Sequence, residues 1–310
     1  EQEFLKKQPF GFYSIESNND HIMHYTGLPN KEIFNIIFSN CDKVLDKYYE
    51  EWNVTCLDRK DQLLVTLMKL KLNHTHTDLG VRFQVSEGTI TNVFLTWLYC
   101  LHEVLYNCLM AIVPTQVKNE LCLPSCFMNF RNCRMVIDCT DFCVQRPKKM
   151  SHQRLFYSSY KHRHTMKALI GVAPNGVITY TSEMYPGSTS DKELFKNCNV
   201  NNVFQPGDLV VADKGFLISD VVPDGVAVNI PPFLSASQFT PIQINSTKKI
   251  ARARIHVERA IRRIKVFKIT KMLPKSLFPH SSKILQVCVA LTNFQPPLLK
   301  EVQHLYNIKP

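Results

Sequence analysis

Residues 134–141 read Arg-Met-Val-Ile-Asp-Cys-Thr-Asp, and the apolar run within them ends in a carboxylate. We predict a buried β-strand at residues 135–138, with Asp138 at its end. Residues 208–213 read Asp-Leu-Val-Val-Ala-Asp and predict a second buried strand, which ends at Asp213. If the two strands pair in parallel, their ends lie at one edge of a sheet. The two runs therefore indicate an acidic site at that edge.

The rest of this half of the chain alternates strands with helices. Asn175-Gly176 is a hairpin signal, and Pro231-Pro232 closes the last strand. We predict strands at 165–172, 177–185 and 226–230, a capped helix at 190–196 and a basic helix at 247–269. This order predicts an α/β, RNase H-like catalytic domain with a mixed five-stranded sheet flanked by helices. Its first three strands are expected to be antiparallel, and its fourth parallel to the first.

We assign residues 126–290 to this domain, residues 1–125 to an all-α region before it, and residues 291–310 to a C-terminal tail. Apolar residues recur with a helical period at 31–46 and 61–72. Because the sequence begins with Glu1 and not Met, we expect a further N-terminal module to precede it.

A helix-turn-helix pattern is predicted at about residues 57–105. A short helix at 77–83 is followed by a turn at Gln84 and Val85, and Ser86 suits the N-cap of the next helix. That helix is expected to bury Ile90, Val93, Phe94 and Trp97. Thr89, Thr91 and Asn92 would then lie on its open face and contact bases in the major groove. Helix pairs of this kind also serve as scaffolding, and that alternative stays open.

Glu258 is a third acid of interest, because it lies on the predicted basic helix beside an apolar stripe. The stripe comprises Ile250, Val257, Ile261, Ile264 and Phe267, and Arg254 and Arg262 flank Glu258 at i−4 and i+4. Three converging acids, Asp138, Asp213 and Glu258, repel each other unless cations balance them. Two Mg²⁺ or Mn²⁺ ions would do so, with the three acids as catalytic metal ligands.

Each acid also has a simpler interpretation, and two other acids compete for the same role. A strand-end Asp can be a turn residue, and Glu258 can form a helical i,i+4 salt bridge. Asp141 follows Asp138 by three residues, and Asp191 lies in the segment Pro-Gly-Ser-Thr-Ser-Asp, where we interpret it as a helix-capping or supporting residue.

The basic excess of the chain is concentrated in two segments. The net charge is +11, from 37 Lys and Arg against 26 Asp and Glu. Residues 248–275 hold eleven Lys or Arg and one acid, whereas residues 142–182 hold seven and none. We predict DNA contacts from both segments, since cations follow phosphates and aromatics stack on unpaired bases. The predicted DNA-contacting residues are Lys148, Lys149, Arg154, Lys161, Arg163, Arg254, Arg262 and Lys265, with Phe156, Tyr157 and Tyr160 interleaved. A solvated hairpin with buried aromatics is the alternative.

The eleven cysteines lack the spacing of a secreted disulfide framework, so we expect reduced thiols. A zinc site is an alternative use for some of them. It would comprise Cys122, Cys126, Cys133, His162 and His164. No apolar run is long enough to span a bilayer, and we expect neither membrane association nor an organic cofactor.

Four segments resemble the DDE superfamily endonucleases, and most closely the Harbinger-like group of eukaryotic DNA transposases. They are Val136–Asp141, Tyr185–Asp191, Val211–Phe216 and Arg254–Lys265. The region before them resembles the helix-turn-helix module of the same group. The resemblance, which covers about residues 57–290, implies Mg²⁺ dependence, cleavage at transposon ends and strand transfer into target DNA. It places Asp138, Asp213 and Glu258 at the catalytic positions.

We therefore expect a nuclear DNA transposase that cuts and joins phosphodiesters, with double-stranded DNA as partner and a homo-oligomer formed on it. Two alternatives remain. One is a domesticated, catalytically silent DNA-binding protein derived from a transposase. The other is an RNase H-like nuclease acting on RNA or hybrids, against which the helix-turn-helix pattern argues.

Overall fold

The computed structural model describes residues 10–231 and 240–305, which divide into two compact units. One unit comprises the residues up to Cys108 together with Val266–Ile269, and the other comprises Leu109–Lys265 and the residues from Thr270. The predicted limits at residues 125 and 290 both lie inside the second unit. Within the described residues, no helix has the length and apolar character that crossing a membrane requires.

The first unit is helical, as predicted. Asn18, Asn30, Asp58 and Thr75 cap its helices with side-chain oxygens that accept backbone N–H groups. The helices are α1 (Asn19–Thr26), α2 (Lys31–Asp42), α3 (Arg59–Leu72), α4 (His76–Phe83), α5 (Glu87–Leu101) and a π-helical continuation at His102–Cys108. The helix predicted at 31–46 thus ends four residues early.

The helix-turn-helix pattern is confirmed at α4 and α5. Gln84 ends α4 in the left-handed conformation, with φ 56°. Ser86 is the N-cap of α5, where its Oγ accepts from the Thr89 N–H at 3.0 Å. The four apolar residues predicted to face inward, Ile90, Val93, Phe94 and Trp97, are all fully buried.

The open face predicted for α5 is wrong at Thr89 and Asn92, because both side chains are buried. The Asn92 amide donates to the Trp52 carbonyl, and its oxygen accepts from the Glu50 N–H, each at 3.0 Å. The loop before α3 covers this face, and its backbone groups need hydrogen-bond partners there. Thr91 is half-buried, donates to the Glu87 carbonyl and lies 2.9 Å from His76 Nδ1.

The second unit contains one mixed sheet in the order β2-β3-β1-β6-β7, with β4 and β5 pairing with β3. β3 runs antiparallel to β1, β6 parallel to β1, and β7 parallel to β6. This is the RNase H-like arrangement that we predicted. The strands are β1 (Cys133–Cys143), β2 (Tyr157–Ser158), β3 (Arg163–Val172), β4 (Ile178–Thr181), β5 (Tyr185–Pro186), β6 (Leu209–Val211) and β7 (Ala227–Asn229).

In the part of the chain that the structure describes, the sheet has seven strands and not the predicted five, because the short β2 was not predicted and one predicted strand is divided. The third predicted strand is divided into β4 and β5. The first does not end at Asp138 but continues to Cys143, with Asp138 paired to Ile170 and Asp141 to Lys167. The sequence pattern fails here because polar residues can lie inside a strand when a neighbouring strand supplies ladder partners, and β3 does so as far as Thr165.

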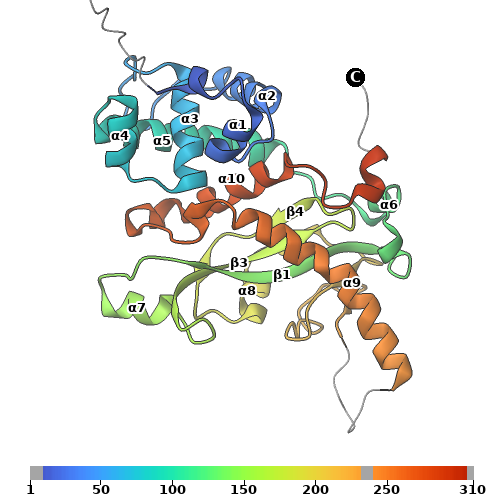
Figure 1. The fold of residues 1–310 in the computed structure, drawn as a ribbon. Coiled ribbons are helices and arrows are strands. Elements are labelled where there is room, and N and C mark those ends of the chain that lie inside the picture. Colours follow the sequence, from blue (N-terminus) through green and yellow to red (C-terminus); the bar gives the residue numbers. More distant parts are fainter. Residues whose placement is uncertain (1–9, 232–239, 306–310) are drawn as a thin grey trace, which may run out of the picture. The chain divides into compact units, whose positions relative to one another are not determined.

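Helices cover both faces of the sheet (Figure 1). Leu194 and Phe195 of α8 (Asp191–Asn197) pack with Met135 and Ile137 of β1 on one face. α9 (Pro241–Ile264) crosses the other face, close to α10 (Ser281–Asn293). The remaining elements are α6 (Gln116–Glu120), α7 (Met150–Phe156) and 3₁₀ turns at Phe12–Ser14, Ser125–Phe127, Val200–Val203, Lys268–Thr270, Lys275–His280 and Lys300–Leu305.

α9 buries Ile250, Val257, Ile261 and Ile264, four residues of its predicted stripe. The fifth, Phe267, was assigned wrongly, because α9 ends at Ile264 and Phe267 belongs to the first unit. There a Cβ on Gly27 would come within 3.0 Å of the Phe267 ring, and Lys71 Nζ lies 5.8 Å from the ring centroid.

Asn92 gives a first testable prediction. Replacing Asn92 with Ala removes both partners of the loop backbone and lowers the free energy of unfolding by about 1–3 kcal/mol. Thr91→Ala is the matched control and costs less, since Thr91 bonds only within the helix-turn-helix. Urea denaturation of the two variants measures the difference. Equal stabilities would contradict a structural role for Asn92.

Candidate active site

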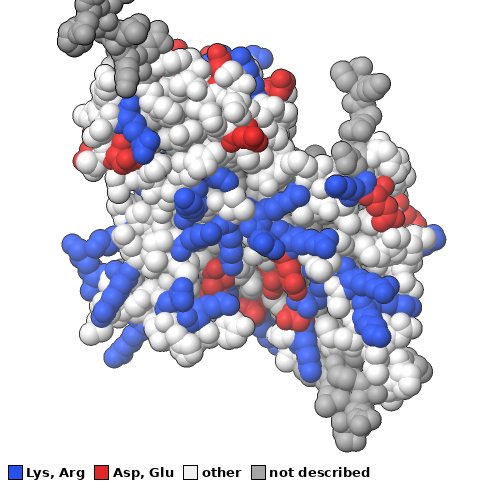
Figure 2. Space-filling model, in the orientation of Figure 1, with Lys and Arg blue, Asp and Glu red and all other residues white. Residues whose placement is uncertain are grey.

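One pocket of the second unit, of about 580 Å³, contains all five acids that the sequence singles out. Four cations and one aromatic residue line the same pocket. In Figure 2, acidic side chains lie among Lys and Arg side chains over the region of α9. The charged and aromatic lining residues are Asp138, Asp141, Asp191, Asp213, Glu258, Arg254, Lys161, Lys167, Lys265 and Tyr160.

The parallel pairing of β1 with β6 places Asp138 beside Asp213. Val136 is opposite Val211 in this ladder. Asp138 and Asp213 each lie two residues further along, so they lie at the same level and on the same face of the sheet. Asp213 follows the end of β6, where its Oδ1 accepts from the Lys214 N–H at 2.7 Å.

α9 covers this face and brings further groups to it. Its Glu258 side chain is 57% exposed and lines the pocket. Lys265, which follows α9, donates from Nζ to Thr140 Oγ1 at 2.6 Å. Thr140 is two residues beyond Asp138 and therefore on the same face. Thr140 was not predicted from the sequence, although strand alternation from Asp138 could have identified it.

The pleat of β1 turns Asp141 to the opposite face, which α8 covers. Met135, Ile137 and Cys139, the residues in phase with Asp141, pack against the α8 side of the core. Asp141 accepts from Thr165 Oγ1 at 2.7 Å. Asp141 and Asp138 therefore approach the pocket from opposite faces of the sheet.

Asp191 belongs to the same side as Asp141. The helix-capping role suggested for Asp191 is wrong, because Ser190 is the N-cap of α8 and its Oγ accepts from the Glu193 N–H. Asp191 is the first helical residue, and its Oδ1 accepts from Lys167 Nζ at 3.0 Å. Lys167 also donates to the Thr189 carbonyl at 2.9 Å and stands opposite Asp141 in the ladder.

Arg254 lies between the two more exposed acids of the α9 face. Its Nη1 is 3.0 Å from Asp213 Oδ1, and its Nη2 is 3.5 Å from Glu258 Oε1. Within residues 10–231 and 240–305, no three His, Cys, Asp or Glu side chains are grouped closely enough to hold an ion. The expected tight cluster of Asp138, Asp213 and Glu258 is thus not found, and the guanidinium group supplies positive charge between two of them.

The electrostatics of Asp138 fit a bound cation. Burial raises the pKa of Asp138 to about 6; Arg254 lowers it, and the neighbouring acids Asp213, Asp191 and Glu258 raise it. The site is therefore short of positive charge at Asp138, while Arg254 pairs with the other two acids. Asp138, Asp213 and Glu258 offer only carboxylate oxygens, which suit Mg²⁺ or Mn²⁺ better than Zn²⁺.

Among the described residues, the members of the zinc alternative form no group of three that could hold an ion. Cys133 is buried at the start of β1, Cys122 Sγ accepts from the Asn175 amide, and Cys126 Sγ lies 3.4 Å from His256 Nε2. His162 is exposed in the turn before β3, with φ 51°. The described part of the chain thus lends the zinc alternative no support.

The predicted DNA-contacting cations of the second unit lie at its surface or in the pocket. Arg254 and Lys265 are half-buried at the pocket, and the other six are exposed. The exposed residues are Lys148, Lys149, Arg154, Lys161, Arg163 and Arg262. Tyr160 is 81% exposed, with Lys161 Nζ 4.4 Å from its ring centroid. Of the interleaved aromatics, Phe156 packs on the ring of Phe278 and Tyr157 packs edge-on against the ring of His164.

Two protein-family models match the chain. The model described as DDE superfamily endonuclease matches residues 137–293, half of the chain and all of the acids discussed above. The model described as helix-turn-helix of DDE superfamily endonuclease matches residues 55–107, which include α3, α4 and α5. Neither the curated proteins nor the solved structures contain a match.

The raised pKa of Asp138 predicts how the metal-free protein responds to pH. The folded state binds the Asp138 proton more tightly than the unfolded chain does, in which the pKa of this carboxyl is 3.8. Stability is therefore lost as the pH rises from about 4 through about 6. Asp138→Asn should abolish this loss and stabilise the metal-free protein at pH 7.5 by on the order of 2 kcal/mol.

Thermal melts in EDTA across this pH range measure the effect. Asp224→Asn, at an exposed acid after β6, is the control and should leave the pH profile unchanged. A profile that keeps its slope in Asp138→Asn would show that the slope has another origin.

Proposed function

Because the chain belongs to the DDE superfamily endonucleases, we propose that it is a DNA transposase that cuts and joins phosphodiesters at transposon ends. The observation that carries this proposal is the register of β1 and β6, which sets Asp138 beside Asp213 on the face that α9 covers with Glu258. Carboxylates that lie side by side within a basic surface suit a reaction on a polyanionic substrate.

Asp138, Asp213 and Glu258 would hold two Mg²⁺ or Mn²⁺ ions. Such ions would activate a water or a 3′-hydroxyl and stabilise the leaving oxygen of an in-line displacement. Arg254 would then exchange its carboxylate partners for a DNA phosphate, since guanidinium binds either group in the same geometry. Thr140 and Lys265 would border the reacting phosphate on the side of Asp138.

DNA would reach the pocket over the cations around it. Lys161, Arg254 and Lys265 line the pocket, and exposed Lys148, Lys149, Arg154, Arg163 and Arg262 extend the basic surface. The substrates would be double-stranded transposon ends and target DNA, contacted in part by the helix-turn-helix, where Thr91 is the remaining candidate. Joining two ends to one target calls for a homo-oligomer, and chromosomal target DNA calls for a nuclear location.

A catalytically silent, DNA-binding descendant of a transposase is the second candidate. One observation favours it: Arg254 already pairs with both Asp213 and Glu258 and offsets part of their charge without a metal. A site that is stable in this state could persist after the loss of cutting. The two candidates share the DNA-binding surface and differ only in metal-dependent chemistry.

The deciding experiment is a cleavage and strand-transfer assay with Mg²⁺ or Mn²⁺. Its substrate is DNA that carries the terminal repeats of the element encoding this chain. We expect the wild type to cut, and Asp213→Ala to lose on the order of 100-fold or more of the rate, the scale of losing one group that stabilises the transition state. Asp224→Ala is the matched control and should cut normally. An inert wild type that still binds DNA would favour the silent protein, and activity in Asp213→Ala would refute the assignment.

Lys161 allows a second test, of the DNA path. Lys161→Ala should weaken DNA binding and lower the slope of log affinity against log salt concentration by about 1, because the variant neutralises one phosphate fewer. Lys196→Ala removes an equal charge from α8, outside the pocket lining, and should leave the slope unchanged. Fluorescence anisotropy over a salt series measures both. Equal slopes for the two variants would exclude a direct bond from Lys161 to a phosphate.

A further inference from the structure

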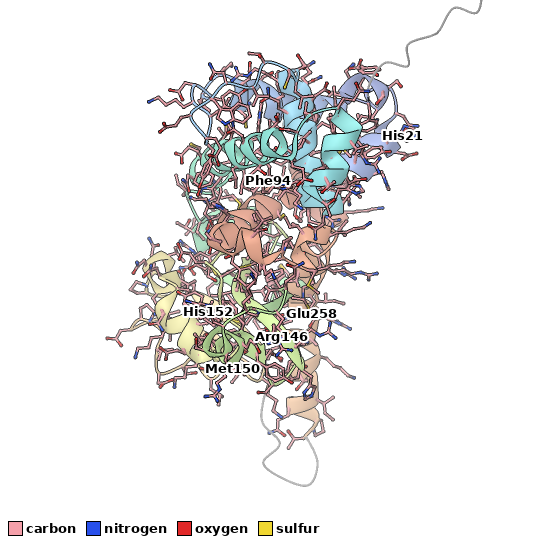
Figure 3. All side chains as sticks on the ribbon, turned by 90° about the vertical axis from the view of Figure 1, so that its left-hand side faces the viewer. His21, Phe94, Arg146, Met150, His152 and Glu258 are labelled. Carbon is pink, nitrogen blue, oxygen red and sulfur yellow. The ribbon has the colours of Figure 1, made fainter. Side chains whose placement is uncertain are left out.

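A second pocket, of about 480 Å³, lies at the end of the second unit that carries α7. Figure 3 looks onto this end, where Arg146 and Met150 lie close together. Its lining combines arginines, hydroxyl groups and apolar surface. The lining residues that matter for a ligand include Arg146, Met150, Gln153, Arg154, Tyr157 and His164.

The charged part of this pocket suits a phosphate. Arg146 and Arg154 both line it, and residues 142–182 contain no acid. Arg146 Nη2 donates to Gln153 Oε1 at 2.9 Å, and Gln153 donates to the Pro147 carbonyl, which orients the guanidinium group. Among the described residues, neither arginine is paired with a carboxylate. Two such cations in one hollow favour an anion between them.

The apolar part of the pocket suits a nucleobase. The Tyr157 ring is 41% exposed and packs edge-on against His164, with centroids 5.7 Å apart. Met150 is 68% exposed beside it. A phosphate alone would leave this surface in water, whereas a stacked base would cover it.

The backbone around the pocket is held in place without a ligand. Tyr157 pairs with His164, and the Ser188 N–H donates to the Leu155 carbonyl at 3.1 Å. A Cβ on the preceding Gly187 would lie only 2.7 Å from the Thr165 carbonyl and 2.8 Å from that of Phe156. This close approach, which only glycine permits, fixes the loop against β2 and β3.

β3 connects this pocket with the acidic one. Asp138 pairs with Ile170, and His164 lies six residues away along β3. At ~3.3 Å per residue, the separation is about 20 Å.

We propose that this second pocket binds one unpaired nucleotide of the DNA, about 20 Å along the sheet from the acidic pocket. Arg146 and Arg154 bind its phosphate, and Tyr157 stacks on its base. A base inside a duplex is already stacked and does not reach Tyr157, so the pocket selects a single-stranded segment. This inference rests on the proposed function for its DNA substrate.

The test compares two fluorescent DNA probes in EDTA, with the full chain. One is a blunt duplex, and the other is the same duplex with a ten-nucleotide overhang on one strand. We expect Tyr157→Ala to bind the overhang probe about tenfold more weakly, the scale of removing one base stack, and the blunt duplex unchanged. Tyr157→Phe keeps the ring and should bind both probes normally, and unchanged binding of the blunt duplex by Tyr157→Ala excludes misfolding as the cause.

The arginines and a matched control complete the experiment. Arg146→Ala combined with Arg154→Ala should lower the salt slope for the overhang probe by about 0.7 for each phosphate that the arginines neutralise in the wild type. Lys196→Ala should not. Equal weakening on both probes, or unchanged binding in Tyr157→Ala, would overturn the inference. Because no cutting is measured, a wild type that fails the cleavage assay yet shows this pattern refutes the proposed function and leaves the nucleotide pocket standing.

Discussion

The acidic pocket depends on the parallel pairing of β1 with β6. Val136 faces Val211 in that ladder, so Asp138 and Asp213 emerge together on one face of the sheet. α9 packs on the same face through its apolar stripe and adds Glu258. A slip of one residue in this pairing would turn Asp213 to the α8 face and separate the two acids.

Repulsion between these acids determines much of what surrounds them. A carboxylate that is both buried and close to other carboxylates holds its proton more tightly, as Asp138 does. Arg254 offsets the charge of Asp213 and Glu258, and Lys265 and Lys161 line the same pocket. In the proposed function the cations that offset the charge of the acids would also bind DNA phosphates, so stability and substrate binding would share one physical basis.

β3 relates the two pockets of the second unit. It pairs with β1 beside Asp138 and with β2 at Tyr157, and a strand has a nearly fixed rise per residue. The distance between the acids and the second pocket is therefore set by the sheet and not by a loop. Under the proposed function, a rigid spacing of this kind would hold a DNA strand at two points.

Local patterns in the sequence determined the elements and the set of available acids, because helical and strand periods and caps such as Ser86 involve neighbouring residues. They could not show that Asn92 is buried under a loop, that β1 runs on to Cys143, or that Phe267 leaves α9. Only the tertiary structure decided that Asp138 and Asp213 lie on one face of the sheet, and that Asp141 and Asp191 lie on the other. The physical reason is that side-chain direction follows pleat and register, and register is set by pairing between segments far apart in the chain.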